Sequence, residues 1–122
     1  MVKKPRKMPD LTIPLTEKIC VPCQGGVLPL KSTDIKKYLS QLDGWQAVKN
    51  HHITKTYLFK NFSEALAFVN RVGKVAEENS HHPDLLLTWG KTCVDIWTHK
   101  INGLTESDFI LAAKCDQVFT QI

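Results

Sequence analysis

The sequence lacks a long hydrophobic run, and no stretch of its 122 residues approaches the about 20 apolar residues that cross a bilayer. Its first residues also lack the apolar core of a secretory signal peptide. From these two absences we expect a cytoplasmic protein with no membrane partner.

Cysteine is too sparse for a small secreted domain stabilised by disulfides, with four residues at positions 20, 23, 93 and 115. Cys20 and Cys23 form a Cys-x-x-Cys pair, which is also half of a zinc ribbon or a thioredoxin-like redox motif. A zinc site needs two further ligands at matching spacing, and the redox motif stands between a strand and a helix. Because the sequence provides neither context, we interpret the two cysteines as small apolar side chains that anchor the segment. Metal binding or a redox function is the alternative.

The sequence also lacks a basic stripe of the kind that binds nucleic acid, although its net charge is +4. Six basic and two acidic residues precede position 32, and ten of each follow it. The excess therefore lies in an N-terminal arm that carries Lys3, Lys4, Arg6 and Lys7. We interpret this arm as a solvated tail and expect no direct nucleic-acid binding, a nucleic-acid arm being the alternative.

A chain of this length is expected to form one domain. Residues 1–30 contain five of the six prolines and the Gly25-Gly26 pair. We predict that they form a basic tail followed by a loop segment without regular structure. Residues 31–122 are then the folded domain.

The spacing of apolar residues predicts three helices and four strands in the order α-β-β-α-β-β-α. Short connections favour hairpins over crossovers, so we expect an α+β fold in which three helices are layered on one face of a four-stranded antiparallel sheet. The expected elements are a helix over 34–42 capped by Ser32 or Thr33, strands over 45–48 and 53–59, a helix over 62–79, strands over 85–89 and 92–99, and a last helix after Thr105.

Two of the predicted helices carry recognisable N-terminal signals. Asn61, with Glu64 three residues on, is typical of a capping box, and Thr105 caps a first turn that contains Asp108. Because an acid in the first turn also complements the helix dipole, Asp108 has either this local effect or a part in a site. The buried face of the long helix is predicted to consist of Phe62, Leu66, Val69, Val72 and Ala76, flanked by Phe68 and Val75.

The second face of the sheet is predicted to carry Trp97 and Trp89 with Leu85 or Leu87. Such an apolar patch needs a cover. The cover is either a second subunit or the chain's own segment 20–30.

Acid/base residues are concentrated between Glu77 and Asp108, a stretch that contains His81-His82-Pro83 and His99. An imidazole titrates near pH ~6.5, so three of them with acidic partners can donate and accept protons at neutral pH. Pro83 disfavours the helical conformation at His82, which fixes the pair at a chain break. Glu77, at the end of a helix, is then a fixed partner for an imidazole, with an exposed last-turn Glu as the alternative.

Three histidines and a carboxylate also suggest a metal site, but zinc ligands usually stand at i,i+4 or short loop spacings that are missing here. We therefore expect no metal. A second pair, His51-His52, lies in a predicted hairpin turn with no acidic residue close in sequence. We interpret that pair as two surface side chains in a loop.

In residue type and spacing, Glu77, His81-His82-Pro83, Trp89, His99 and Asp108 resemble the signature of the pterin-4a-carbinolamine dehydratase family, with Trp in place of the more familiar Tyr at position 89. The likeness extends over about residues 30–118. The resemblance implies a hydro-lyase that removes water from a 4a-hydroxytetrahydropterin to give the quinonoid dihydropterin. Such an enzyme recycles the pterin cofactor of aromatic amino acid hydroxylases.

The resemblance also implies roles for particular residues. The catalytic residues would be His81, His82, His99, Glu77 and Asp108, and the substrate contacts would be His81, His82, Pro83, Trp89, Thr98, His99, Lys100 and Ile101. No cofactor is expected, because the pterin is the substrate. A homo-oligomer, either dimer or tetramer, and functional pairing with a hydroxylase are expected.

The alternative function is a non-catalytic interaction module or transcriptional coactivator that stabilises a partner's dimer. A pure adaptor would not need three histidines with acidic partners. The complete set of these residues therefore favours the enzyme.

Overall fold

The structure is a computed structural model that describes residues 13–20 and 27–122. Its elements, in chain order, are the 3₁₀ turn η1 (Leu15–Glu17), helix α1 (Ser32–Leu39), strands β1 (Gln46–Val48) and β2 (His52–Leu58), helix α2 (Phe62–Glu78), strands β3 (Asp84–Thr88) and β4 (Lys91–Ile96), the 3₁₀ turn η2 (His99–Ile101) and helix α3 (Glu106–Thr120). Leaving aside the two 3₁₀ turns, this is the predicted order of helices and strands.

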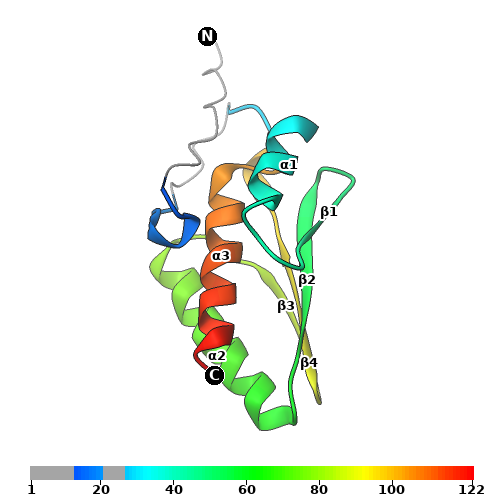
Figure 1. The fold of residues 1–122 in the computed structure, drawn as a ribbon, viewed down its shortest axis with the longest axis vertical. Helices are drawn as coiled ribbons and strands as arrows, with labels where there is room; N and C mark the ends of the chain where they lie inside the picture. Colours follow the sequence, from blue (N-terminus) through cyan, green and yellow to red (C-terminus); the bar gives the residue numbers. More distant parts are fainter. Residues whose placement is uncertain (1–12, 21–26) are drawn as a thin grey trace.

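The four strands form one antiparallel sheet in the order β1-β2-β4-β3. The three helices lie together on one side of this sheet (Figure 1). The predicted α+β fold is therefore confirmed, including the two hairpins β1–β2 and β3–β4. Within the described ranges, no helix is long and apolar enough to cross a membrane.

The strand register decides which side chains face the helices. Ile53 pairs with Ile96 in the centre of the sheet, and both are buried beneath the helices. Leu85 pairs with Val94, which is buried, so Leu85 and Leu87 also face the helices. The prediction that Leu85 or Leu87 lies on the second face is therefore wrong, because the register pairs these residues with Val94 and Thr92, which are both buried.

The second face of the sheet, called the open face below, is not covered by any described helix (Figure 1). By alternation along the strands it carries Leu58, Leu86, Cys93 and Trp97. Leu58 and Leu86 are exposed, and Trp97 is half-buried. The apolar character predicted for this face is therefore present, with Leu86 in place of its two neighbours.

Helix α2 begins as the sequence predicts but buries a different stripe. The Asn61 side chain accepts a hydrogen bond from the Glu64 backbone N–H at 2.9 Å, as expected for the N-cap. Ala65, Phe68, Val72 and Ala76 are its buried residues, whereas Phe62 and Leu66 are exposed. The small Ala65 lets the helix approach its neighbours, and the buried stripe is rotated accordingly.

Other boundaries also shift. Helix α1 begins at Ser32 after Lys31, without a side-chain cap, and ends at Leu39 rather than Leu42. The tight turn of the first hairpin is made by Lys49 and Asn50, both at positive φ. His52 therefore belongs to β2 and not to the turn.

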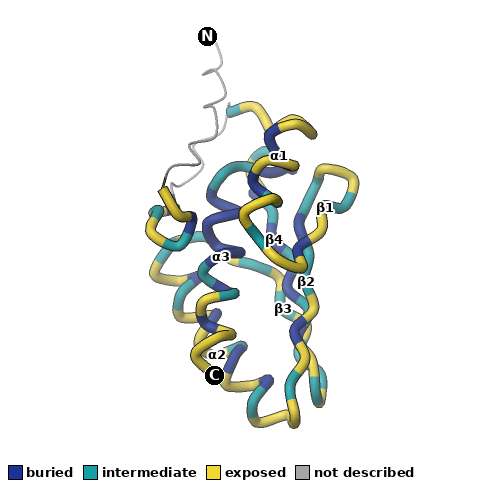
Figure 2. The backbone as a smooth tube through the Cα atoms, viewed as in Figure 1, coloured by how far each residue is buried: buried dark blue, intermediate teal, exposed yellow. Residues whose placement is uncertain are grey.

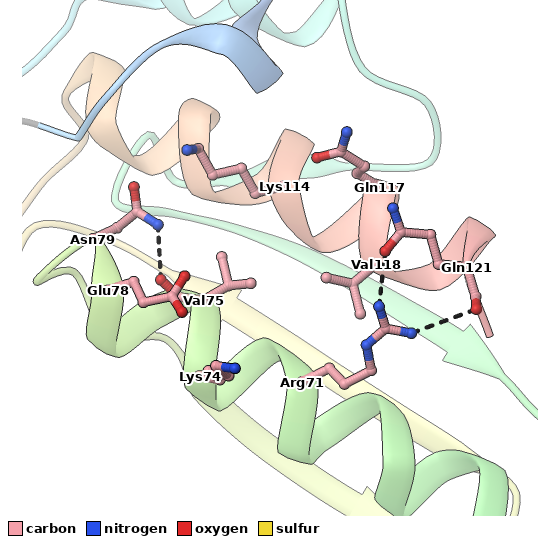
Figure 3. A pocket seen from close by; sticks show the side chains of 9 residues that line it. All are labelled: Arg71, Lys74, Val75, Glu78, Asn79, Lys114, Gln117, Val118 and Gln121. Atoms are coloured by element: carbon pink, nitrogen blue, oxygen red, sulfur yellow. Dashed lines mark hydrogen bonds between the residues drawn. The ribbon is translucent and has the colours of Figure 1, made fainter.

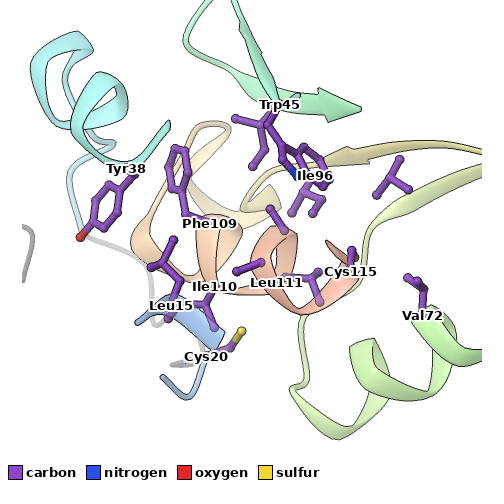
Figure 4. Close-up of a cluster of buried hydrophobic side chains, with 14 of the residues drawn as sticks. Leu15, Cys20, Tyr38, Trp45, Val72, Ile96, Phe109, Ile110, Leu111 and Cys115 are labelled. Atoms are coloured by element: carbon purple, nitrogen blue, oxygen red, sulfur yellow. The ribbon is translucent and has the colours of Figure 1, made fainter. Parts of the chain in front are cut away.

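Helix α3 is the centre of the core, and most of its length is buried (Figure 2). Figure 4 shows Phe109, Ile110 and Leu111 of α3 among buried side chains from the other elements. Tyr38 of α1 stacks on Phe109 with a centroid distance of 4.9 Å. Every residue from Ser107 to Ala113 is buried, so this part of the helix has neighbours on all sides.

The N-terminal segment contributes to this core, which the loop prediction did not anticipate. Leu15 of η1 and Cys20 are buried beside Ile110 (Figure 4), and the Leu30 N–H donates to Leu104 O at 2.9 Å. Burial raises the pKa of the Cys20 thiol to about 11, and its Sγ donates to Ser107 O at 3.6 Å. Cys23 lies outside the described residues.

A carboxylate on α3 joins the helix to the sheet. Asp116 accepts hydrogen bonds from Trp45 Nε1 at 3.1 Å, from Lys55 Nζ at 2.8 Å and from Tyr57 Oη at 2.5 Å. Burial, followed by the hydrogen bond to Asp116, raises the pKa of Tyr57 far above its usual range. The Tyr57 hydroxyl therefore remains a donor at every physiological pH.

The exposed apolar residues of the open face lead us to expect an assembly larger than one chain. The described part of the N-terminal segment packs on the helix side, so it does not cover Leu58 or Leu86. Light scattering at micromolar concentration should give a mass above the 13.8 kDa of one chain. A single 13.8 kDa species would contradict this expectation.

Candidate active site

The end of α2 fixes the backbone of His81. The His81 N–H donates to Ala76 O at 3.1 Å, and the Ser80 N–H donates to Glu77 O at 3.2 Å. Ser80 is left-handed, with φ 51°. This pair of bonds is a Schellman motif, in which the residue after the left-handed position turns back over the last helical turn. His81 is therefore tied directly to the helix.

Ser80 occupies a position that usually requires glycine, because a Cβ there costs about 1–2 kcal/mol. We expect Ser80→Gly to raise the free energy of unfolding by about 0.5–1 kcal/mol, a gain reduced by the greater entropy of the unfolded chain. Ser80→Val should lower it. Urea unfolding of the two variants measures the difference, and a stabilising Val would show that Ser80 is not held left-handed.

The His81 side chain meets the first turn of α3. Its Nε2 lies 2.5 Å from Asp108 Oδ1, with the imidazole 15% exposed and the carboxylate 0% exposed. Asp108 Oδ2 accepts two further hydrogen bonds, from Thr98 Oγ1 at 2.9 Å and from the Thr105 N–H at 2.8 Å. The carboxylate thus completes the capping box of α3 and also bonds an imidazole, while its part in a catalytic site stays a prediction.

His82 pairs with the acid at the end of α2. Its Nε2 lies 3.0 Å from Glu77 Oε1, and the two side chains are 61% and 80% exposed. An ion pair with this exposure contributes little to stability. Its geometric effect is to point one ring nitrogen of His82 at Glu77 and the other away from it.

His99 occupies the first position of η2 and does not end a strand, which corrects the sequence prediction. The β4 strand stops at Ile96, and Thr98 and Gly103 then form an isolated antiparallel bridge that closes a small loop. His99 follows Thr98, whose hydroxyl bonds Asp108. The segments that carry the three histidines therefore converge on Asp108.

The backbone of the Thr98–Ile101 segment is largely occupied by its own turn. The Thr98 N–H donates to Gly103 O at 2.8 Å, and Thr98 O accepts from the Ile101 N–H at 3.3 Å. The Thr98 side chain is buried. The polar groups of Thr98 thus have partners within the chain, and the substrate contacts predicted for this segment stay predictions.

Trp89 is separated from the histidines within the chain. It lies in the β3–β4 turn and is 69% exposed. Pro83 and Trp89 flank the five residues of β3, so a rise of about 3.4 Å per residue places Trp89 about 20 Å along the strand from Pro83. Trp89 therefore lies a strand's length from the histidines of its own chain, and its contact with the substrate stays a prediction.

The His51-His52 pair is not the pair of surface side chains that the sequence suggests. Both residues are half-buried on the open face. Their ring centroids lie 5.2 Å and 6.0 Å from that of Trp97. The hairpin register, which sequence spacing does not fix, brings them over β4.

A separate groove of 330 Å³ runs between α2 and α3 (Figure 3). Arg71, Lys74 and Lys114 are among its lining residues, and Arg71 Nη2 donates to Gln121 Oε1 at 2.8 Å. None of the predicted site residues lines this groove. The acid/base groups therefore lie outside it.

The fold is an α+β domain in which the imidazoles of His81 and His82 are each paired with a carboxylate. Residues 28–118 match the family described as Pterin 4 alpha carbinolamine dehydratase. The chain belongs to this family.

Relatives and a solved structure agree with the assignment. Proteins provisionally named pterin-4-alpha-carbinolamine dehydratase are 54% identical in Rubrobacter xylanophilus and 51% identical in Alkaliphilus metalliredigens, covering 85% and 84% of this chain and 97% and 94% of theirs. A crystal structure of a transcriptional coactivator/pterin dehydratase from Brucella melitensis is 34% identical, with a TM-score of 0.71 over 74% of this chain and 97% of that one.

Proposed function

We propose that this protein is a hydro-lyase that removes water from a 4a-hydroxytetrahydropterin and yields the quinonoid dihydropterin. In the cell this reaction would recycle the pterin cofactor of an aromatic amino acid hydroxylase. The observation that carries the proposal is the pairing of His81 with Asp108 and of His82 with Glu77 in a member of this family.

The carboxylates determine which ring nitrogens face outward. An ionised carboxylate only accepts hydrogen bonds, so Nε2 of His81 and Nε2 of His82 both carry a proton. Each ring then presents Nδ1 on its other side. That nitrogen accepts a proton when the ring is neutral and donates one when the ring is charged.

The proposed reaction needs one proton donor and one acceptor. Breaking the C4a–O bond releases the hydroxyl, which takes up a proton to leave as water, while a ring nitrogen loses its proton to complete the quinonoid system. A neutral and a protonated imidazole exchange these two protons with the substrate. We assign the two roles to the set His81, His82 and His99 as a group.

The Brucella melitensis protein is described as a transcriptional coactivator as well as a dehydratase, which keeps the interaction module as the second candidate. An adaptor surface gains nothing from a buried carboxylate that orients an imidazole. The His81–Asp108 pair therefore favours the enzyme.

The test follows the decay of chemically generated 4a-carbinolamine by ultraviolet absorbance, with and without the purified protein. We expect dehydration well above the spontaneous rate, and saturation with substrate. Decay at the spontaneous rate would refute the enzyme. A heat-treated sample of the same protein is the control for non-specific catalysis.

A further inference from the structure

The three histidines of the site are not held in the same way. His81 and His82 each bond a carboxylate, whereas the His99 ring makes no hydrogen bond to any residue within 13–20 and 27–122. Its contact in that part of the chain is with the Trp97 indole, at a centroid distance of 4.4 Å and an interplanar angle of 53°. His99 itself is exposed on a short 3₁₀ turn. Without this contact, little would restrict the rotamer of its ring.

The Trp97 indole is in turn enclosed by the first hairpin. His51 contacts it at a centroid distance of 5.2 Å and His52 at 6.0 Å. His51 and His52 lie edge to face, with their Nδ1 atoms 3.0 Å apart. One indole thus lies between the His51-His52 pair and His99.

A hydrogen bond joins this ring cluster to the turn that carries His99. His51 Nε2 lies 2.8 Å from Asn102 Oδ1, and Asn102 closes η2 in the left-handed conformation with φ 50°. The amide oxygen only accepts, so His51 Nε2 carries the proton and its Nδ1 accepts one from His52 Nδ1. Only this arrangement satisfies both contacts when the two rings are neutral. The β1–β2 hairpin is therefore linked to η2 through side chains.

We propose that Trp97 is a positioning residue that fixes the ring of His99, and that His51, bonded to Asn102, holds Trp97 in place. The predicted effect on rate rests on the proposed function, but the positioning itself does not. A proton-transferring group must be held within about 0.5 Å of its working geometry, and misplacement by about 1 Å can cost 10²-fold in rate. His99, which has no carboxylate partner in the described structure, depends on the indole for that precision.

The test compares Trp97→Leu with Trp97→Phe, which keeps an aromatic face, and with Leu86→Ala, an exposed control on the same sheet face. Two measurements are made on each protein. Proton–carbon NMR records the His99 ring signals, assigned by their loss in His99→Gln. Kinetics of carbinolamine dehydration give kcat and KM.

In the wild type, the indole ring current should shift the His99 ring protons away from their positions in a free histidine. Trp97→Leu should abolish this shift and lower kcat by about 10- to 100-fold, with a much smaller change in KM. Trp97→Phe should retain most of the ring-current shift and most of kcat, and Leu86→Ala should change neither quantity. Asn102→Gly, which suits the left-handed backbone, should produce a smaller loss of the same kind.

Free-histidine positions for the His99 signals in the wild type would overturn the proposal, and so would a normal kcat in a folded Trp97→Leu. If Trp97→Leu does not fold, Trp97→Phe and Asn102→Gly decide by the same two measurements. If no form of the protein catalyses dehydration, the proposed function fails. The NMR shifts then still decide whether the indole positions His99.

Discussion

We expect Asp108→Asn to lower the rate constant for carbinolamine dehydration by about 10²–10⁴-fold, the range that applies to a positioned acid or base. The buried carboxylate accepts from three donors: His81 Nε2, the Thr98 hydroxyl and the Thr105 N–H. An amide has only one oxygen, so its NH₂ group must face either His81 or the two threonine donors. Where it faces His81, the ring has to present Nε2 as the acceptor and Nδ1 as the donor. The reacting nitrogen then has the wrong protonation for one of the two proton transfers.

Asp108→Ala is the matched variant, because it removes the acceptor without offering a new donor. Three buried or half-buried donors then lose their partner, which should cost about 2–5 kcal/mol of unfolding free energy. Urea denaturation and single-turnover kinetics on both variants separate the two effects. An Asn variant that retains full activity would show that the tautomer of His81 does not matter for the reaction.

Replacing His82 or His99 by Gln should lower the dehydration rate by about 10²–10⁴-fold while changing the melting temperature little. Both side chains are exposed, so neither replacement opens a cavity in the core. His81→Gln should lose activity similarly but also some stability, since its Nε2 bonds the buried Asp108. Glu77→Gln should fall between the wild type and the histidine variants, because the amide can still accept from His82.

The rate of each variant is measured beside its melting temperature, with Leu86→Ala as a control on the open face. Equal losses in all variants, or losses that follow unfolding, would leave no support for an acid/base site. A rate unaffected by replacing His82 or His99 would remove that histidine from the mechanism. Double replacement of His51 and His52 is expected to reduce activity, because both rings contact Trp97.

The elements of the fold could be predicted because each has a local signal. Asn61 followed by Glu64 marks the start of α2, and Thr105 followed by Asp108 marks the start of α3. Period-two alternation marks the strands. The buried face of α2 was predicted wrongly, because its orientation has no local signal. Ala65 lies inside and Leu66 outside, and this rotation of the helix depends on what it packs against.

The candidate site could be named from the sequence but not assembled from it. Glu77, the three histidines and Asp108 are marked by residue type and spacing. Which acid partners which imidazole is decided by the packing of α3 beneath the end of α2 and by the turn at Ser80. Trp89 shows that residue spacing does not predict position in space, since it matches the family signature and yet lies in the β3–β4 turn, at the other end of β3 from the histidines.

By itself, the sequence determined the element order, the sheet with helices on one face, and the residues able to carry protons, because helix caps, alternation and ionisable side chains are properties of short stretches. Tertiary structure alone decided that Asp108 holds His81, that Thr98 is buried behind it, and that His51, His52 and Trp97 adjoin His99. These contacts join residues far apart in the chain. Their geometry depends on strand register and helix rotation, which are set by packing over the whole core.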